Sequence, residues 1–196
     1  MKRLVIAVDC DDVLVRTTPY FVHAYTQTYG GAVTLDRAHD ADYGMWGTDK
    51  LTLEKRLAEL METDEYKSIS PTAEEVEVLS EMSRHYELHV ITARRPHERE
   101  LTQHMLDTYL PGVFTSLELV GFTGSKWEVC QRLGADVLID DNLRHLEDAV
   151  REGLPQSGAL LFGDYPWTAY ESIPEGLTRC LNWADVAKEI QDLAQH

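Results

Sequence analysis

The stretch VDCDDVL at residues 8–14 follows the apolar run LVIA at residues 4–7. The apolar run predicts a buried strand, because parallel strands that are covered on both faces are continuously hydrophobic. Asp9, Asp11 and Asp12 then crowd together just beyond the strand, where like charges repel one another. Such crowding does not stabilise a fold, so we interpret it as a functional feature.

Four further apolar runs predict the rest of a parallel sheet. With the first run at 3–8, they lie at residues 87–92, 116–122, 136–140 and 158–163. Helix-like segments near 97–109, 125–133 and 143–152 separate the last four runs. This alternation predicts an α/β fold, a doubly wound (Rossmann-like) parallel sheet of five strands.

A long segment between the first two predicted strands predicts an insertion. Helical patterns occupy residues 19–30 and 50–63, and a further helix over 71–86 leads into the second strand. We expect residues 16–70 to form a small helical insertion over the carboxyl ends of the strands, where open α/β sheets bind ligands. The core domain then comprises residues 1–15 and 71–196.

The overall charge limits the classes of partner. The formal net charge is −16, from 34 acidic and 18 basic residues, which argues against a nucleic-acid polymer or an anionic membrane as the main partner. No apolar run has the length of a membrane span, and the run after Lys2 and Arg3 is short for a secretory signal. Three scattered cysteines predict reduced thiols in a cytoplasmic protein without a zinc site.

A second acidic pair ends another predicted strand. Asp140 and Asp141 close the stretch LIDD at residues 138–141, and they reach the same edge as Asp9 if the first and fourth strands are neighbours. Isolated acidic pairs are usually helix caps or solvated loops. Two pairs that each end a buried strand, without His or Cys, instead predict a site for a hard divalent cation, Mg²⁺.

Two further residues suit an anion at this edge. Thr92 ends the stretch VITA at residues 90–93, and its hydroxyl could hold a phosphate oxygen or cap the following helix. Gly124 and Ser125 predict a turn and an N-cap, which places Lys126 in a first helical turn, where the helix dipole disfavours a cation. An ammonium directed at the carboxylates and a bound anion explains this placement, and a solvated surface lysine is the alternative.

Taken in order, VDCDDVL, VITAR, Lys126 and LIDD resemble the motifs of the haloacid dehalogenase superfamily of phosphotransferases over the whole chain. The predicted insertion is similar to the small helical C1-type cap of that superfamily. The chain length, the DDVL continuation and the stretch LLFGDYPWT at 160–168 resemble the cytosolic type-C 5′(3′)-deoxyribonucleotidases and their bacterial relatives.

The resemblance implies catalytic roles for the motif residues. Asp9 would be the nucleophile that forms an aspartyl-phosphate, and Asp11 would be the general acid and then the general base. Thr92 and Lys126 would hold the phosphoryl oxygens and offset their charge.

The resemblance also implies a metal site. Mg²⁺ would be bound by the Asp9 side chain, the Asp11 backbone carbonyl and Asp140, with Asp141 as a further ligand or as an orienting group. The sequence departs from the family at Asp12, which stands where glycine is usual, and at Val13, which stands where threonine is usual. The implied mechanism gives Asp12 no role.

Substrate contacts are expected from both parts of the chain. Trp46 lies in a turn flanked by glycines and could stack on a nucleobase, whereas Tyr20 and Phe21 have the helical spacing of core residues. Arg94 and Arg95 could meet phosphate or form structural ion pairs. The expected substrate-binding residues are Thr92, Ala93, Arg94, Lys126 and Trp46.

These observations predict a Mg²⁺-dependent phosphatase for a small phosphorylated metabolite, with (deoxy)nucleoside monophosphates as the leading substrates. A phosphatase for a sugar phosphate is the second hypothesis, and a catalytically silent binding protein is the third. The presence of Asp11 argues against the third, and also against a dehalogenase, since a halide needs no general acid. The oligomeric state stays open, and a homodimer is compatible with the sequence.

Overall fold

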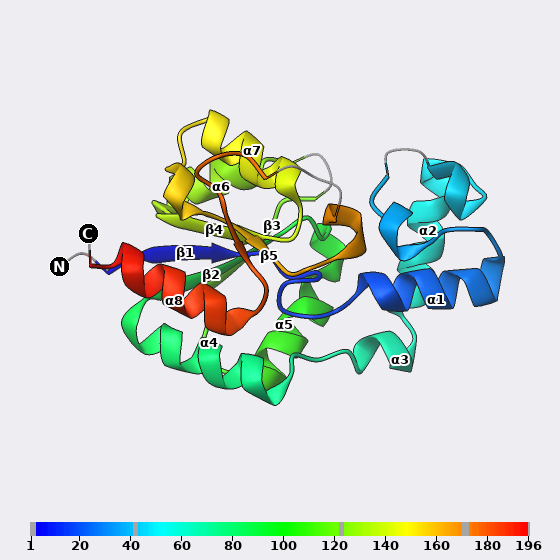
Figure 1. Cartoon of the computed structure of the whole chain (residues 1–196). Coiled ribbons are helices and arrows are strands. Elements are labelled where there is room, and N and C mark those ends of the chain that lie inside the picture. Colours follow the sequence, from blue (N-terminus) through cyan, green and yellow to red (C-terminus); the bar gives the residue numbers. More distant parts are fainter. Residues whose placement is uncertain (1–2, 41–42, 122–123, 170–172, 196) are drawn as a thin grey trace.

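The computed structural model describes residues 3–40, 43–121, 124–169 and 173–195. A parallel sheet with strand order β3-β2-β1-β4-β5-β6 forms its centre (Figure 1). The strands are β1 (Val5–Val8), β2 (Glu87–Thr92), β3 (Ser116–Leu119), β4 (Val137–Asp140), β5 (Ala159–Phe162) and β6 (Thr178–Cys180). The α/β class is therefore confirmed.

The sheet has one strand more than the sequence predicted. Strand β6 pairs with β5 at the edge of the sheet and contains three residues, of which only Cys180 is buried. A strand of three residues is too short to show either an apolar run or an alternation of apolar and polar residues, which are the two patterns that indicate strands. The expectation of five strands is corrected to six.

Helices cover both faces of the sheet (Figure 1). One face packs against helices α4 (Ala73–His85), α5 (Arg99–Tyr109) and α8 (Trp183–Leu193), and the other against α6 (Lys126–Leu133) and α7 (Leu143–Arg151). Along β1, Ile6 and Val8 belong to the first hydrophobic cluster and Ala7 to the second. Side chains of a strand alternate between faces, so a strand buried on both faces must be apolar throughout.

The segment after β1 forms a separate group of helices. It contains α1 (Thr18–Tyr29), η1 (Leu35–Arg37), η2 (Tyr43–Trp46), α2 (Lys50–Met61) and α3 (Asp64–Lys67). Figure 1 shows α1 and α2 beyond the carboxyl end of β1, to the right of the sheet. The group has its own hydrophobic cluster, which includes Tyr25, Leu53 and Leu60. We call these elements the insertion.

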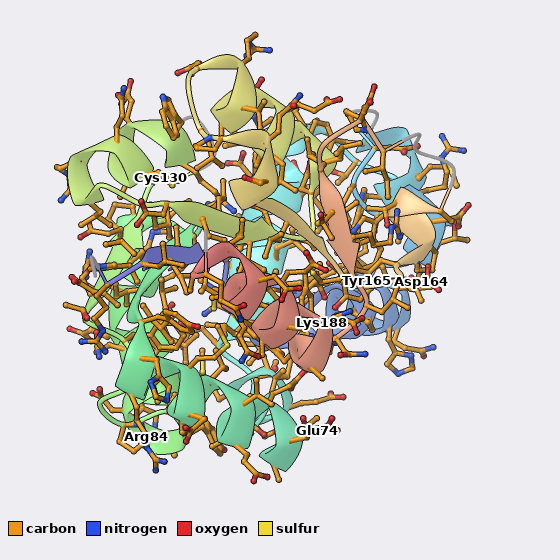
Figure 2. All side chains as sticks on the ribbon, turned by 60° about the vertical axis from the view of Figure 1, so that its left-hand side comes forward. Glu74, Arg84, Cys130, Asp164, Tyr165 and Lys188 are labelled. Carbon is orange, nitrogen blue, oxygen red and sulfur yellow. The ribbon has the colours of Figure 1, made fainter. Side chains whose placement is uncertain are left out.

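The ends of the core helices follow from local sequence. Thr72 and Glu75 form a capping box at the start of α4, and Glu74 and Arg84, at the two ends of that helix in Figure 2, suit the helix dipole. Helix α6 begins at Lys126, and the Ser125 side chain accepts a hydrogen bond from the Glu128 amide. The predicted turn and N-cap before Lys126 are confirmed. The remaining short elements are the 3-10 helices η3 (Pro96–Glu98), η4 (Gln156–Gly158) and η5 (Pro166–Thr168).

The three cysteines are part of the protein interior. Cys10, Cys130 and Cys180 are free and buried, and burial raises the pKa of the Cys130 and Cys180 thiols to about 12. These two side chains therefore stay neutral thiols and act as small core residues.

Across the parts of the chain that the structure describes, no helix combines the length and the hydrophobicity that a membrane span needs.

Candidate active site

The acidic residues lie where β1 and β4 run side by side. The Asp9 amide donates a hydrogen bond to the Ile139 carbonyl at 2.9 Å, so Asp9 lies beside the end of β4. Asp140 is the last residue of β4, and Asp141 follows it. In the observed strand order, β2 and β3 lie on one side of β1, and β4, β5 and β6 lie on the other. The carboxyl ends of β1 and β4 therefore form a topological switch point of the sheet. The predicted proximity of the two acidic pairs is confirmed.

Lys126 joins the two pairs. Its Nζ lies 2.6 Å from Asp140 Oδ2 and 3.0 Å from Asp9 Oδ1, and its side chain is 4% exposed. Burial by itself lowers the pKa of Lys126, but the charges of Asp140 and Asp9 raise that pKa above its usual value. The residue is therefore a buried, charged ammonium directed at the carboxylates, which agrees with the first of the two sequence interpretations.

The cluster carries more negative than positive charge. Asp9, Asp140 and Asp141 each offer a carboxylate oxygen within 4.8 Å of the others. Burial raises the pKa of Asp9 to about 7, and burial together with the neighbouring carboxylates raises that of Asp141. With all three carboxylates ionised, one ammonium would leave two negative charges in a buried site, and the raised pKa values of Asp9 and Asp141 reflect that cost. This donor set and this charge fit one divalent cation with oxygen ligands.

The two carboxylates after β4 differ in what contacts them. Asp140 Oδ1 accepts a hydrogen bond from the Asn142 amide, while Oδ2 contacts Lys126 and, at 3.2 Å, His145 Nδ1. Burial raises the pKa of Asp140, but Lys126 and His145 outweigh it and hold that pKa below its usual range. Asp141 Oδ2 accepts one hydrogen bond, at 3.0 Å, from Trp167 Nε1. Asp141 is thus the more available of the two for a metal ion.

Asp11 is paired with an arginine. Arg94 Nε lies 2.9 Å from Asp11 Oδ2, Arg94 Nη2 lies 2.7 Å from Oδ1, and Thr17 Oγ1 donates to Oδ1 at 2.9 Å. Burial raises the pKa of Asp11, but the Arg94 guanidinium outweighs it and holds that pKa below its usual range. Of the two interpretations of Arg94, the structure shows the ion pair.

Asp12 forms a backbone anchor. Its φ of 59° is the left-handed conformation that glycine usually supplies and that Asp tolerates better than most residues. Its amide donates to the Val15 carbonyl, and its carboxylate accepts hydrogen bonds from the Thr18 amide and hydroxyl. Asp12 therefore ties the turn after β1 to the first turn of α1, which is a structural role that the sequence did not reveal.

The remaining predicted residues lie in two places. Thr92 is fully buried at the end of β2, where its hydroxyl accepts a hydrogen bond from the Arg94 amide, and Ala93 between them is half-buried. Trp46 lies in the hydrophobic cluster of the insertion, 5% exposed and edge-on to Tyr25 at 5.0 Å between ring centroids. Trp46 thus has the surroundings of a core side chain, and its contact with substrate stays a prediction.

A stack of rings joins the core to the insertion, and sequence reasoning missed it. The Trp167 ring lies between Tyr165, at 4.4 Å, and His39, at 4.7 Å. The Tyr165 hydroxyl donates to the Asp12 carbonyl, and Tyr165 lies close to the insertion in Figure 2. The aromatic stretch after β5 was visible in the sequence, but nothing local indicated that its partners lie more than 100 positions earlier.

Comparison with known proteins matches nearly the whole chain to one family. The model of the family described as "5' nucleotidase, deoxy (Pyrimidine), cytosolic type C protein" matches residues 3–195. The chain belongs to this family. It is therefore a phosphoric monoester hydrolase of the haloacid dehalogenase superfamily, as the motifs indicated. A search of curated proteins gave no match.

Solved structures share the fold at low identity. A haloacid dehalogenase-like hydrolase from Streptococcus pneumoniae is 13% identical, with a TM-score of 0.65 over 98% of both chains. A predicted phosphatase from Clostridium acetobutylicum is 11% identical, with a TM-score of 0.67 over 98% of this chain and 100% of its own. A predicted phosphoglycolate phosphatase from Haemophilus somnus is 14% identical, with a TM-score of 0.63 over 97% and 99%. These likenesses show a common architecture that includes the insertion.

Proposed function

We propose that the protein is a Mg²⁺-dependent 5′-nucleotidase that hydrolyses (deoxy)nucleoside monophosphates through an aspartyl-phosphate on Asp9. One observation carries this proposal. The Asp9 carboxylate lies at the switch point of the sheet, 3.0 Å from a buried ammonium and next to two further carboxylates whose charge that ammonium does not balance. A nucleophile that acts on an anionic phosphate needs its own charge and that of the substrate to be offset, which the ammonium and a divalent cation held by these carboxylates would do.

The metal would be held by Asp9, the Asp11 backbone carbonyl and Asp141, while Asp140 would orient Lys126. The hydrogen bonds described above favour this assignment, because both Asp140 oxygens already accept from Asn142, Lys126 or His145. When bound, Mg²⁺ would offset the two excess negative charges and the charge of the phosphoryl oxygens.

The chain's own residues would carry the two chemical steps. Asp9 attacks the phosphorus and forms an acyl-phosphate bond while the ester bond to the leaving oxygen breaks, and Asp11 gives that oxygen a proton. Asp11 then accepts a proton from the water that attacks the same phosphorus, which frees Asp9 and inorganic phosphate. Lys126 and Thr92 hold the phosphoryl oxygens during both steps.

The insertion, residues 16–70, would act as a cap over this site, with residues 1–15 and 71–196 as the core domain. Its separate hydrophobic cluster and its position beyond the carboxyl end of β1 support this division (Figure 1). The choice of a nucleotide rests on the family, and a cytoplasmic location accords with the family's description as cytosolic. A sugar phosphate under the cap is the second candidate.

Substitution Asp9→Asn tests the mechanism. With p-nitrophenyl phosphate and Mg²⁺ we expect kcat to fall by on the order of 10⁴-fold or more, as removal of a nucleophile does. Asp164→Asn is the matched control, since this carboxylate lies in the loop after β5 and its side chain is 80% exposed. Turnover that survives Asp9→Asn would contradict the aspartyl-phosphate.

A screen of phosphate monoesters tests the substrate class. We expect metal-dependent hydrolysis of nucleoside monophosphates, with the deoxy forms among the best substrates. Hydrolysis of sugar phosphates without any nucleotide would select the second candidate. A folded protein that hydrolyses no monoester with any divalent ion would be a binding protein instead.

A further inference from the structure

The contact between Arg94 and Asp11 uses the whole guanidinium. Two of its nitrogens, Nε and Nη2, donate to the two oxygens of Asp11. The third, Nη1, donates to Thr102 Oγ1 on α5 at 2.9 Å, and Arg94 is 6% exposed. A planar fork that is held at all three nitrogens fixes both the position and the plane of the carboxylate it binds.

Other parts of the molecule also hold this pair. Thr17, the residue before α1, donates to Asp11 Oδ1. The Tyr66 ring, on α3 of the insertion, lies 6.0 Å from the Arg94 guanidinium carbon. Within the described residues, the buried Tyr66 hydroxyl has no hydrogen-bond partner. The fork therefore lies where the core, the connection to the insertion and the insertion meet.

We propose that Arg94 is a positioning residue that orients Asp11 toward the leaving oxygen. One of its two hydrogen bonds to Asp11 is released when Asp11 acts as an acid, while the other keeps the carboxylate in place. This inference rests on the proposed function. Each oxygen of Asp11 accepts a hydrogen bond from an N–H of Arg94, and an oxygen that takes up a proton becomes a weaker acceptor, so its hydrogen bond to Arg94 weakens. The remaining hydrogen bond then prevents Asp11 from turning away. Since misplacement by about 1 Å can cost 10²-fold in rate, the fork matters wherever Asp11 acts as an acid.

The inference predicts a dependence on the leaving group. Phenyl phosphate and p-nitrophenyl phosphate have similar shapes, but the phenolate is the more basic leaving group and needs the proton from Asp11 more. The ratio kcat/KM reports only the steps up to departure of the leaving group, which separates this role of Asp11 from its later role with water.

Substitution Arg94→Gln removes the fork. We expect kcat/KM for phenyl phosphate to fall about 10- to 100-fold, a part of the roughly 10²- to 10⁴-fold that general acid catalysis contributes, and that for p-nitrophenyl phosphate to fall less than about 3-fold. Arg94→Lys keeps the charge with a single donor group and should recover part of the loss. It also serves if the Gln variant does not fold, as thermal melting will show. An equal fall for both substrates would make Arg94 a simple phosphate contact, and no fall would remove its role; either result overturns the inference.

Substitution Asp11→Asn separates this inference from the proposed function. If Asp11 is the general acid, this variant shows the same preference for the better leaving group, and Arg94→Gln adds no further loss to it. If Asp11→Asn shows no such preference, the acid role itself fails. If Asp11→Asn shows it and Arg94→Gln does not, only the inference fails. Arg95→Gln is the matched control, because it removes the same charge at the next residue, where the arginine pairs with Glu98 at 3.3 Å. This variant should change kcat/KM for both substrates by the same factor.

Discussion

The buried carboxylates around Lys126 and the half-buried carboxylate of Asp11 beside Arg94 lie at the same edge of the sheet, and they differ in charge balance. Around Lys126, one ammonium faces Asp9 and Asp140, with Asp141 beside them. Around Arg94, one guanidinium faces Asp11 and occupies both of its oxygens. Buried carboxylates persist only when their charge is offset. The second group is therefore complete as it stands, whereas the first has room and need for a divalent ion.

The largest effect is expected from Lys126→Gln, which removes the ammonium that faces Asp9 and Asp140 and so increases the excess of negative charge there. Removal of one partner of a buried ion pair costs about 3–5 kcal/mol, so the free energy of unfolding of the metal-free protein should fall by that amount. Chemical denaturation without Mg²⁺ measures it, with the exposed Lys188→Gln on α8 as the control (Figure 2). An unchanged stability would mean that Lys126 does not balance the cluster.

The next effect distinguishes the two carboxylates after β4. Asp141→Asn should raise the Mg²⁺ concentration for half-maximal activity about 10- to 100-fold, as loss of a group that supports a metal site does. Asp140→Asn should mainly lower the melting temperature, because Asp140 holds Lys126 and His145. The two variants are each other's controls, and the opposite pattern would make Asp140 the ligand.

A smaller effect is expected from pH on the metal-free protein. The pKa is raised to about 7 at Asp9 and to about 6 at Asp12, mainly by burial. Between the ordinary carboxyl pKa and these values, the folded state binds more protons than the unfolded state, so stability should fall as the pH rises from about 4 to 7. The raised pKa of Asp141 adds to this fall, whereas burial lowers the pKa of His39 to about 4 and so acts in the opposite direction. We expect the three raised carboxyl pKa values to outweigh the one lowered histidine pKa. The pKa values of Asp11 and Asp140 are lowered, so their contributions change only below this window.

Melting temperatures across that pH range, with and without Mg²⁺, test the expectation. The increase in melting temperature that Mg²⁺ causes should grow with pH, because the ion offsets charges that protons offset at lower pH. A metal-free protein whose melting temperature rises between pH 4 and 7 would contradict the charge excess around Lys126.

The smallest effect is expected at Asp12, whose carboxylate accepts hydrogen bonds only from Thr18 among the described residues. Asp12→Asn keeps an acceptor oxygen and tolerates φ above zero, so the free energy of unfolding should change by less than about 1 kcal/mol. Asp12→Ala loses the acceptor and is strained at this φ, so it should cost about 1–3 kcal/mol. Equal effects of the two variants would show that the carboxylate does not anchor α1.

The sequence by itself determined the features that neighbouring residues encode. Apolar runs predicted all five strands from β1 to β5, because strands covered on both faces are largely hydrophobic. The N-cap at Ser125 placed Lys126 in the first turn of α6, and the carboxyl ends of parallel strands brought Asp9 and Asp140 to one edge. The short edge strand β6 carries no such pattern and was missed.

Only the tertiary structure decided which charges meet. Arg94 and Asp11 are 83 positions apart, and Trp167 and Asp141 are 26 apart, so no local periodicity relates them. The choice between an ion pair and a phosphate contact at Arg94 depends on where the loop after β2 lies relative to the turn after β1. Chain proximity determines helices, strands and caps, whereas the balance of buried charge depends on long-range packing, and here that packing separates a closed ion pair from a site that needs a cation.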